Sequence, residues 1–340
     1  MIVRNTFKAA WWLPGPHAQT FWPRISSRNH KIAVRQERLE LPDSDFVDLA
    51  WTTGHSGPIV IVLHGLEGDI RSPYAARIMA AFHRKGWRGV LMHFRGCSAT
   101  PNRMARSYHS GDTGDLRYLI ETLNAREPGT SLAAVGYSLG GNVLLKYLGE
   151  YRQDVALEAA VAVSVPFDLH NSAERLDQGL SRIYQRLLLK SLCAKMRQKF
   201  QTIKPPIALG QLNTLKNFRA FDDAITAPLH GFEDVNDYYS RSSSRQYLNS
   251  ICIPTLILHA VDDPFMTPAA IPNASELSPS ISLELSERGG HVGFISGPAP
   301  WRATYWLDDR IPSFLTPYIV GSERGQTNIA SSNNNASTHF

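Results

Sequence analysis

The chain has 340 residues, of which 43% are hydrophobic and 19% charged, a composition typical of a globular protein rather than a disordered one. Its 35 cationic and 30 acidic side chains give a net charge of +5, which is too close to balance to predict a nucleic-acid-binding protein. No glycine period, heptad or repeated block predicts a collagen-like, coiled-coil or repeat architecture.

Cysteine content and hydropathy favour the cytoplasm. Three scattered cysteines, Cys97, Cys193 and Cys252, are too few for a disulfide framework or a zinc cage, and they fit a reducing compartment. No run approaches the roughly 18 apolar residues that span a bilayer, and no apolar segment typical of a secretory signal precedes Trp11. We therefore expect a cytoplasmic protein with no metal site.

Residues 1–30 are rich in tryptophan and proline, and we expect an irregular arm that packs on the main body. The alternative is a surface that contacts lipid, because tryptophan favours membrane interfaces. Residues 33–40 and 45–51 alternate between apolar and polar types, which predicts an antiparallel hairpin.

From residue 59 onward, apolar runs alternate with helical patterns. The predicted strands are 59–63, 89–94, 132–137, 159–165, 255–261 and 281–285. The predicted helices are 73–85, 112–126 with Asp112 as its cap, 140–151, and a closing helix near 300–319. This alternation predicts an α/β fold with a mostly parallel, doubly wound sheet flanked by helices.

The segment from about 167 to 250 interrupts this alternation and we expect it to form an inserted helical cap. In 178–199, apolar residues recur at helical spacing: Leu180, Ile183, Tyr184, Leu187, Leu188, Leu192 and Met196. The cations of this stretch lie largely on other faces: Arg182, Arg186, Lys190, Lys195, Arg197 and Lys199. We interpret it as a solvated lid helix; a membrane surface or an acidic partner is the alternative. Residues 321–340 are of low complexity, and we expect a disordered tail.

The motif that carries chemistry is GYSLG at 136–140, a GxSxG sequence between a predicted strand and a predicted helix. In this context a sharp strand-to-helix turn exposes the serine hydroxyl, and the flanking glycines avoid collisions with neighbouring backbone. Ser138 is therefore the predicted nucleophile.

A serine hydroxyl is a weak nucleophile, so a base and an orienting acid must follow it. In α/β folds whose nucleophile lies in such a GxSxG turn, the chain order is serine, then aspartate or glutamate, then histidine. Asp262 and Asp263 close the strand 255–261, and His291 follows the last predicted strand. We favour Asp263, which directly precedes a proline turn; Asp262 stays an alternative, otherwise a solvated neighbour or an acceptor that braces the loop.

The oxyanion of an acyl-transfer intermediate needs two backbone donors. The residue after the nucleophile, Leu139, supplies one. The other is expected from the turn after strand 59–63, at the amide of Leu66; a plain strand-end turn is the alternative.

Five motifs together resemble the YheT-like α/β hydrolases, the bacterial relatives of plant and animal α/β-hydrolase-domain proteins. They are LHGLEG at 63–68, HFRGCS at 93–98, GYSLGGN at 136–142, HAVDDPFM at 259–266 and GGHVGF at 289–294. The resemblance covers about residues 12–320. It implies an α/β-hydrolase fold with a helical cap, no cofactor, a Ser138–Asp263–His291 relay and hydrolysis of carboxylic esters. Some eukaryotic relatives act on lipids and carry a membrane anchor, which we do not expect here.

We therefore expect a serine carboxylesterase that acts on a small-molecule ester, binds no nucleic acid and needs no cofactor. Its domain is expected at 31–320, behind the arm and before the tail. One alternative is an interfacial lipase or phospholipase with peripheral membrane contact, favoured by the aromatic arm and the basic lid helix. The other is a binding protein that keeps the fold without turnover. Neither the ester nor the oligomeric state is predicted.

Overall fold

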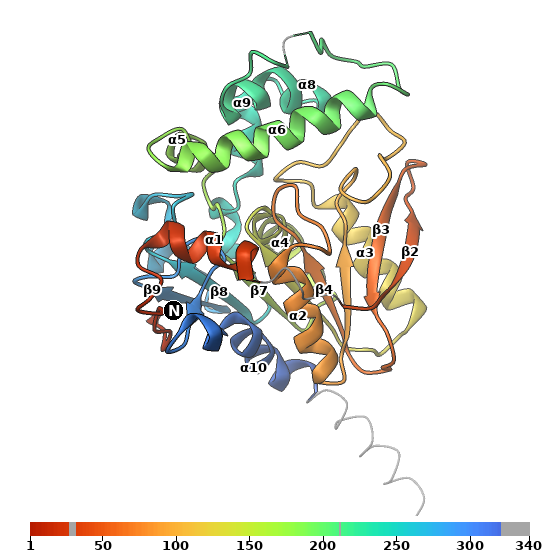
Figure 1. Cartoon of the computed structure of the whole chain (residues 1–340). Coiled ribbons are helices and arrows are strands. Elements are labelled where there is room, and N and C mark those ends of the chain that lie inside the picture. The colour runs from red at the N-terminus through yellow and green to blue at the C-terminus, as the bar shows by residue number, and fades with distance from the viewer. Residues whose placement is uncertain (27–31, 211, 321–340) are drawn as a thin grey trace, which may run out of the picture.

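A computed structural model describes residues 1–26, 32–210 and 212–320, and a nine-stranded sheet forms its centre (Figure 1). The strand order is β1-β9-β8-β7-β6-β4-β5-β3-β2. Six parallel strands form the middle: β4 (Ile59–Leu63), β5 (Arg88–Met92), β6 (Leu132–Tyr137), β7 (Ala159–Val163), β8 (Thr255–Ala260) and β9 (Ile281–Ser286). These strands confirm the predicted parallel α/β sheet.

Helices cover both faces of the sheet, as the continuous apolar strands require. Ile61 packs in a layer with helices α3 (Gly114–Arg126) and α4 (Leu139–Tyr151), whereas its neighbours Val60 and Val62 pack with α2 (Pro73–Arg84) and α10 (Leu307–Ile319). Successive side chains of a strand point to opposite faces, so β4 is buried on both. Each such buried side chain contributes about 1.5–3 kcal/mol to folding.

The two edges of the sheet differ. At one edge, β2 (Val34–Glu40) and β3 (Phe46–Thr52) form the predicted antiparallel hairpin, and β3 pairs with β5 in antiparallel register. At the other edge, β1 (Ile2–Arg4) pairs in parallel with β9.

The prediction of an irregular arm over residues 1–30 was therefore wrong for the described part of it, which contains β1 and helix α1 (Pro16–Ser26). The strand has only three residues, too few to show a period, and it forms because the edge of β9 offers backbone partners. Helix α1 is fixed by Gln19, whose buried side-chain amide donates to Ile295 O and accepts from Ile295 N. Residues 27–30 lie outside the described residues.

Two predicted helix starts also differ. Asp112 does not cap α3, because its carboxylate accepts a hydrogen bond from Arg106 and Thr113 takes the N-cap position. The closing helix begins at Leu307 rather than near 300. The preceding residues instead form a short pairing of β10 (Ile295–Ser296) with β11 (Thr304–Tyr305).

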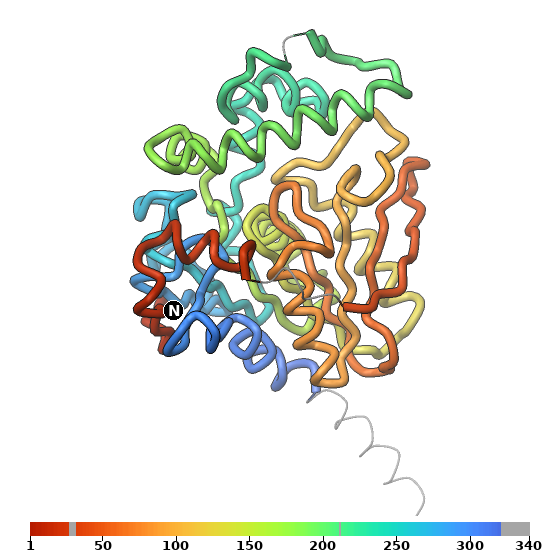
Figure 2. The backbone as a smooth tube through the Cα atoms, in the orientation of Figure 1, coloured from red at the N-terminus to blue at the C-terminus, as the bar shows by residue number. Residues whose placement is uncertain are grey.

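Between β7 and β8 the chain forms a group of helices that covers the carboxyl ends of the strands (Figure 1), and we call residues 167–250 the cap. Its helices are α5 (Leu169–Leu176), α6 (Ser181–Lys199), α7 (Phe218–Phe221), α8 (Ala227–His230) and α9 (Val235–Ser242), with a π-helical turn at Asp222–Thr226. The chain enters and leaves the cap side by side (Figure 2), and Arg245 N donates to Phe167 O at 3.1 Å. Treating the cap as an insertion in one domain stays a prediction, and the tail 321–340 lies outside the described residues.

Candidate active site

The predicted nucleophile lies at a strained turn. Ser138 joins β6 to α4 with φ 52° and ψ −119°, a conformation that a non-glycine residue adopts only where its surroundings enforce it. A Cβ atom on Gly136 would lie 2.4 Å from Gly140 O, and one on Gly140 would lie 2.6 Å from Leu63 O. Both flanking glycines are thus needed for close backbone packing, as the GxSxG motif predicts.

Three of the predicted site residues form one chain of hydrogen bonds. His291 Nε2 lies 2.9 Å from Ser138 Oγ, and His291 Nδ1 lies 2.8 Å from Asp263 Oδ2. A carboxylate can only accept, so we assign the ring proton to Nδ1, which leaves Nε2 to accept from the serine hydroxyl. Asp263 is buried, and its other oxygen accepts from Phe265 N at 2.8 Å.

The neighbouring aspartate has a different position. Asp262 Oδ1 accepts from Gly290 N at 2.9 Å, so it braces the loop that carries His291. Burial raises the pKa of Asp262, and the amides of Gly290 and Gly289 partly oppose that rise. The sequence left both carboxylates open. In the structure Asp263 contacts the imidazole of His291, whereas Asp262 contacts the backbone of the preceding residue, Gly290.

Segments far apart in the chain hold the histidine loop. His291 N donates to Thr20 Oγ1 of α1 at 2.9 Å, and Val292 N donates to Ser164 Oγ at 3.0 Å. A Cβ on Gly290 would lie 2.5 Å from Pro16 O, so glycine permits α1 to approach the loop. Thr20 and Ser164 were not predicted as site residues, because neither lies in a motif that signals this contact.

An aromatic ring covers the imidazole. The ring of Phe265 stacks on His291 with centroids 3.9 Å apart and planes at 3°. Phe265 is part of the quoted HAVDDPFM motif, but nothing in the sequence indicated that it contacts the histidine. The stack fixes the plane of the imidazole, and the electron-rich face of a phenyl ring also attracts a protonated imidazole.

The turn expected to supply an oxyanion donor lies next to Ser138. Gly68 N donates to Gly65 O at 2.9 Å, which closes a tight turn with Glu67 at φ 58°. A Cβ on Gly65 would lie 3.3 Å from Ser138 Cβ. Among the residues that the structure describes, the amides of Leu66 and Leu139 have no acceptor, and both residues border the cavity at Ser138. Two free donors are thus available beside the nucleophile.

A cavity of about 200 Å3 separates the core from the cap, and Ser138 and His291 border it. Apolar side chains of the cap line one wall: Leu176, Leu188, Leu192, Met196, Phe218, Phe221 and Ile225. Polar groups lie along another part of its lining, among them Asp222, whose carboxylate accepts from Tyr239 Oη at 2.7 Å. Burial raises the pKa of Asp222 to about 6. The lining suits a mainly apolar ligand.

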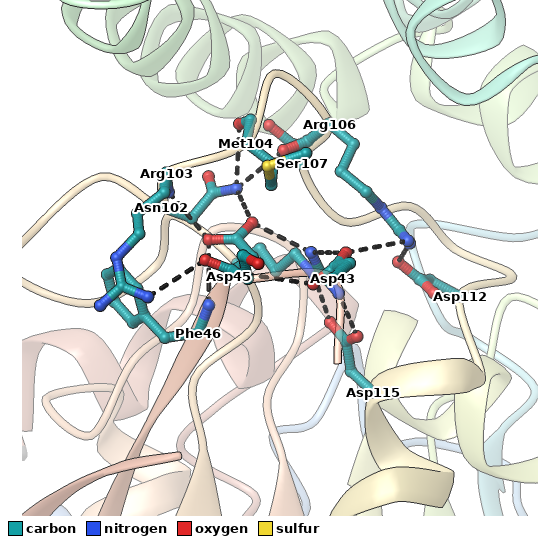
Figure 3. Close-up of polar contacts among 12 residues, drawn as sticks. Asp43, Asp45, Phe46, Asn102, Arg103, Met104, Arg106, Ser107, Asp112 and Asp115 are labelled. Atoms are coloured by element: carbon teal, nitrogen blue, oxygen red, sulfur yellow. Dashed lines mark hydrogen bonds and ion pairs between the residues drawn. The ribbon is translucent and has the colours of Figure 1, made fainter. Parts of the chain in front are cut away.

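A buried polar network connects the cap to the core. Asp45 is fully buried and accepts from Asn102 Nδ2 at 2.5 Å (Figure 3) and from Arg95 Nη1 at 3.0 Å. Arg95 also pairs with Asp115 at 2.6 Å. Asn102 Oδ1 accepts from Lys199 Nζ of α6 at 2.9 Å, so the network reaches from the β2–β3 hairpin to the cap.

Most cations of the lid helix lie away from its packed side, as predicted: Arg182, Arg186, Lys190 and Arg197 are exposed. The remaining two, Lys195 and Lys199, turn toward the core. Lys199 is buried, and Lys195 pairs with the buried carboxylate of Glu67 at 3.1 Å. Both can turn inward because the core offers acceptors there, which the periodicity of the helix does not reveal.

His93, which ends a strand near the site, is buried at the β3–β5 contact and does not border the cavity. Within residues 1–26, 32–210 and 212–320, no three His, Cys, Asp or Glu side chains are grouped so that they could hold a metal ion. No helix in those same ranges has the length and apolar character needed to cross a membrane.

The fold and the site together define the class of protein. A model of the alpha/beta hydrolase fold family matches residues 58–298, so the chain belongs to that family. Within it the chain is YheT-like, as the resemblance implied. It is 46% identical over 309 residues to "Putative esterase YheT" of Escherichia coli, which covers 89% of this chain and 91% of that protein.

More distant relatives and solved structures agree with this placement. Phospholipase ABHD3 of Mus musculus is 28% identical over 318 residues, 89% of this chain and 77% of that protein. Monoacylglycerol lipase of Saccharomyces cerevisiae is 31% identical over 266 residues, 76% of this chain and 59% of that protein. The esterase Pf2001 of Pyrococcus furiosus superposes with a TM-score of 0.55 at 15% identity, covering 94% of this chain and 99% of that one, which shows the shared fold.

Proposed function

We propose that the protein is a serine carboxylic ester hydrolase that works through an acyl-enzyme on Ser138. The observation that carries this proposal is the continuous hydrogen-bond chain from Ser138 through His291 to Asp263 at a strained strand-to-helix turn. A nucleophile, a base and an orienting carboxylate in this arrangement are what serine-dependent acyl transfer requires.

In the first half-reaction, Ser138 Oγ attacks the ester carbonyl carbon while His291 Nε2 takes the hydroxyl proton. Asp263 keeps the imidazole in the productive tautomer and stabilises the imidazolium that forms. The amides of Leu66 and Leu139 stabilise the oxyanion. As the tetrahedral intermediate collapses, the carbon–oxygen ester bond breaks and His291 gives its proton to the leaving alcohol.

In the second half-reaction, His291 takes a proton from water and the hydroxide attacks the acyl carbon of the ester on Ser138. Collapse of this second intermediate releases the carboxylic acid and returns the proton to Ser138 Oγ. The apolar cavity wall supports an acyl or alkyl chain as the part of the substrate that is recognised. The names of the relatives, an esterase, a phospholipase and a lipase, support an ester as the substrate class.

The test uses a fluorophosphonate probe and p-nitrophenyl esters with the purified protein. The probe is expected to label the peptide that contains Ser138, and Ser138→Ala is expected to abolish both labelling and turnover. Ser56→Ala, at an exposed serine, is the matched control and keeps both. Undiminished turnover in Ser138→Ala would contradict the mechanism, and a wild-type protein that neither labels nor turns over would favour a non-catalytic binding protein.

A second candidate is a lipase that works at a membrane surface. The observation that favours it is the outer face at the start of α6, where Leu180, Ile183 and Leu187 have exposed fractions of 61%, 45% and 48%. The exposed cations Arg182 and Arg186 are their neighbours in the sequence. An exposed apolar stripe flanked by cations suits an anionic lipid surface.

Sedimentation with phosphatidylglycerol vesicles tests this candidate. Binding is expected for the wild type and its loss for Ile183→Asp with Leu187→Asp. Phosphatidylcholine vesicles provide the uncharged control. Failure of the wild type to sediment, together with a preference for short soluble esters, would contradict the interfacial function and leave the esterase proposal unchanged.

A further inference from the structure

The residue that follows Leu66 has an unusual set of partners. The Glu67 side chain is 4% exposed, and both carboxylate oxygens are occupied. Ser191 Oγ donates to Oε2 at 2.5 Å, and Lys195 Nζ donates to Oε1 at 3.1 Å. Ser191 and Lys195 are four residues apart on α6 and thus share one face of that helix. A carboxylate of the oxyanion turn is therefore held by the cap.

The backbone of Glu67 explains why the turn needs such support. Its φ of 58° lies in the left-handed region, where glycine or asparagine is the usual residue of a tight turn. Tyr108 Oη accepts from Glu67 N at 3.0 Å and donates to Glu67 Oε1 at 3.0 Å. The same side chain that α6 holds is thereby linked to the peptide group between Leu66 and Glu67.

Charge pairing favours the same arrangement. A buried carboxylate without a cationic partner is strongly disfavoured, and Lys195 supplies that partner. Burial lowers the pKa of Lys195, but Cys97 and Glu67 beside it outweigh burial and raise that pKa above its ordinary value. Lys195 is therefore a cation at neutral pH, and the ion pair persists there.

We propose that Glu67 is a positioning residue that couples the cap to the oxyanion site: α6, through Ser191 and Lys195, fixes the orientation of the turn that carries the Leu66 amide. This inference rests on the proposed ester hydrolysis. Leu192 and Met196 of the same helix line the cavity, so a substrate chain packed against them also holds α6 in place. Binding energy from a remote part of the substrate is thereby used at the reacting carbonyl.

The experiment compares Glu67→Gln, Ser191→Ala and Lys195→Met with Arg197→Met, an exposed cation on the same helix, as the matched control. We expect Glu67→Gln to lower kcat by about 10- to 100-fold, because a displaced donor loses part of the 10²- to 10³-fold that one oxyanion donor supplies. KM is expected to change less than twofold. Ser191→Ala and Lys195→Met are expected to lower kcat several-fold, and the double variants with Glu67→Gln to show no further loss.

A readout specific to the oxyanion distinguishes positioning from a general loosening of the cap. The inhibition constant of a trifluoromethyl ketone, which adds to Ser138 Oγ and places an oxyanion at the same site, is expected to rise in proportion to the loss of kcat. Ser191→Thr, which keeps the hydroxyl, is expected to restore most of the wild-type rate. Circular dichroism identifies any variant that fails to fold, and the cap-side Ser191 variants then decide the question.

The inference is overturned if kcat of the folded Glu67→Gln or Ser191→Ala variant stays within twofold of the wild type. It is also overturned if KM rises while the affinity for the trifluoromethyl ketone is unchanged. These outcomes differ from failure of the proposed function, in which the wild-type protein itself does not react with a fluorophosphonate at Ser138.

Discussion

The core and the cap contribute to the candidate site in different ways. In the core, Ser138, Asp263 and His291 follow β6, β8 and β9. The parallel strands of one sheet therefore bring all three residues to the carboxyl ends of the strands. Among the described residues of the cap, none joins that hydrogen-bond chain; the cap helices line the cavity with apolar side chains. We infer that the core determines the chemistry and that the cap determines which esters reach it.

The two regions also keep their positions by different means. The core is tied together by strand pairing and by apolar layers on both sheet faces. The cap has its own apolar cluster, which meets the core at Leu66 and Phe265. It is also anchored by the half-buried side chain of Lys195 and the buried side chain of Lys199. Single substitutions can remove these cap anchors without disturbing the sheet. The contributions of the core and the cap can therefore be measured separately.

The largest effect is expected in the core. Asp263→Asn should lower kcat by about 10⁴-fold, since loss of the carboxylate that orients the base leaves the wrong tautomer in place. Asp262→Asn is the matched control, and its effect should stay within about tenfold because it removes only the partner of the Gly290 amide. Turnover of a p-nitrophenyl ester checks both variants. A larger loss in Asp262→Asn would show that the geometry at His291 does not identify the acid.

A smaller effect, on selectivity, is expected from the cap. Leu192→Trp fills part of the cavity, so kcat/KM for a dodecanoyl ester should fall by about 10- to 100-fold relative to an acetyl ester. Ala194→Trp, exposed on the same helix, should leave that ratio unchanged. A panel of esters with increasing acyl length provides the measurement. Equal losses for long and short esters in Leu192→Trp would break the assignment of selectivity to the cap.

The cap anchor at Lys199 should affect stability more than chemistry. Lys199→Met leaves the acceptors Asn102 Oδ1, Arg106 O and Ser107 Oγ without their donor, and the free energy of unfolding should fall by about 1–3 kcal/mol. Thermal or urea unfolding monitored by circular dichroism measures this change. Lys190→Met, on the exposed face of α6, is the control and should unfold like the wild type.

The pH dependence of the free energy of unfolding tests the position of Lys199 specifically. Burial, followed by the charges of Arg95 and Arg106, lowers the pKa of Lys199 to about 7, although Asp45 opposes this shift. Between pH 7 and about 10.4 the unfolded chain then binds more protons at this lysine than the folded protein, so its contribution to stability rises with pH. Lys199→Met should lack that rise, which is at most about 1.4 kcal/mol per pH unit. Parallel curves for variant and wild type would contradict the inward, desolvated position.

The smallest effect is expected where the two regions meet. Phe265→Leu removes the ring that stacks on His291, and kcat should fall about 2- to 10-fold, the size of an aromatic stacking or cation–π contribution of about 0.5–1.5 kcal/mol. Phe265→Tyr, which keeps the stack, should retain the wild-type rate. Equal rates in Phe265→Leu and Phe265→Tyr would show that the stack has no influence on the base.

Local sequence determined much of the core, because its signals are short-range. Apolar runs such as Ile59–Leu63 specify buried strands, and the glycines around Ser138 specify the turn that exposes it. The order of Ser138, Asp263 and His291 was readable for the same reason, since each follows a strand that the sequence reveals. Even so, the sequence alone left Asp262 and Asp263 both open.

Only the tertiary structure decided how these parts are held together. Three contacts join segments that no local pattern connects. They are the hydrogen bond of Thr20 to the His291 loop, the stack of Phe265 on His291, and the hydrogen bond from α6 to Glu67. The three residues of β1 show no period, and they form a strand because β9 has an open edge. The direction of Lys199 depends on acceptors about a hundred residues away. Sequence therefore determined which residues can do the chemistry, and long-range packing decided what positions them.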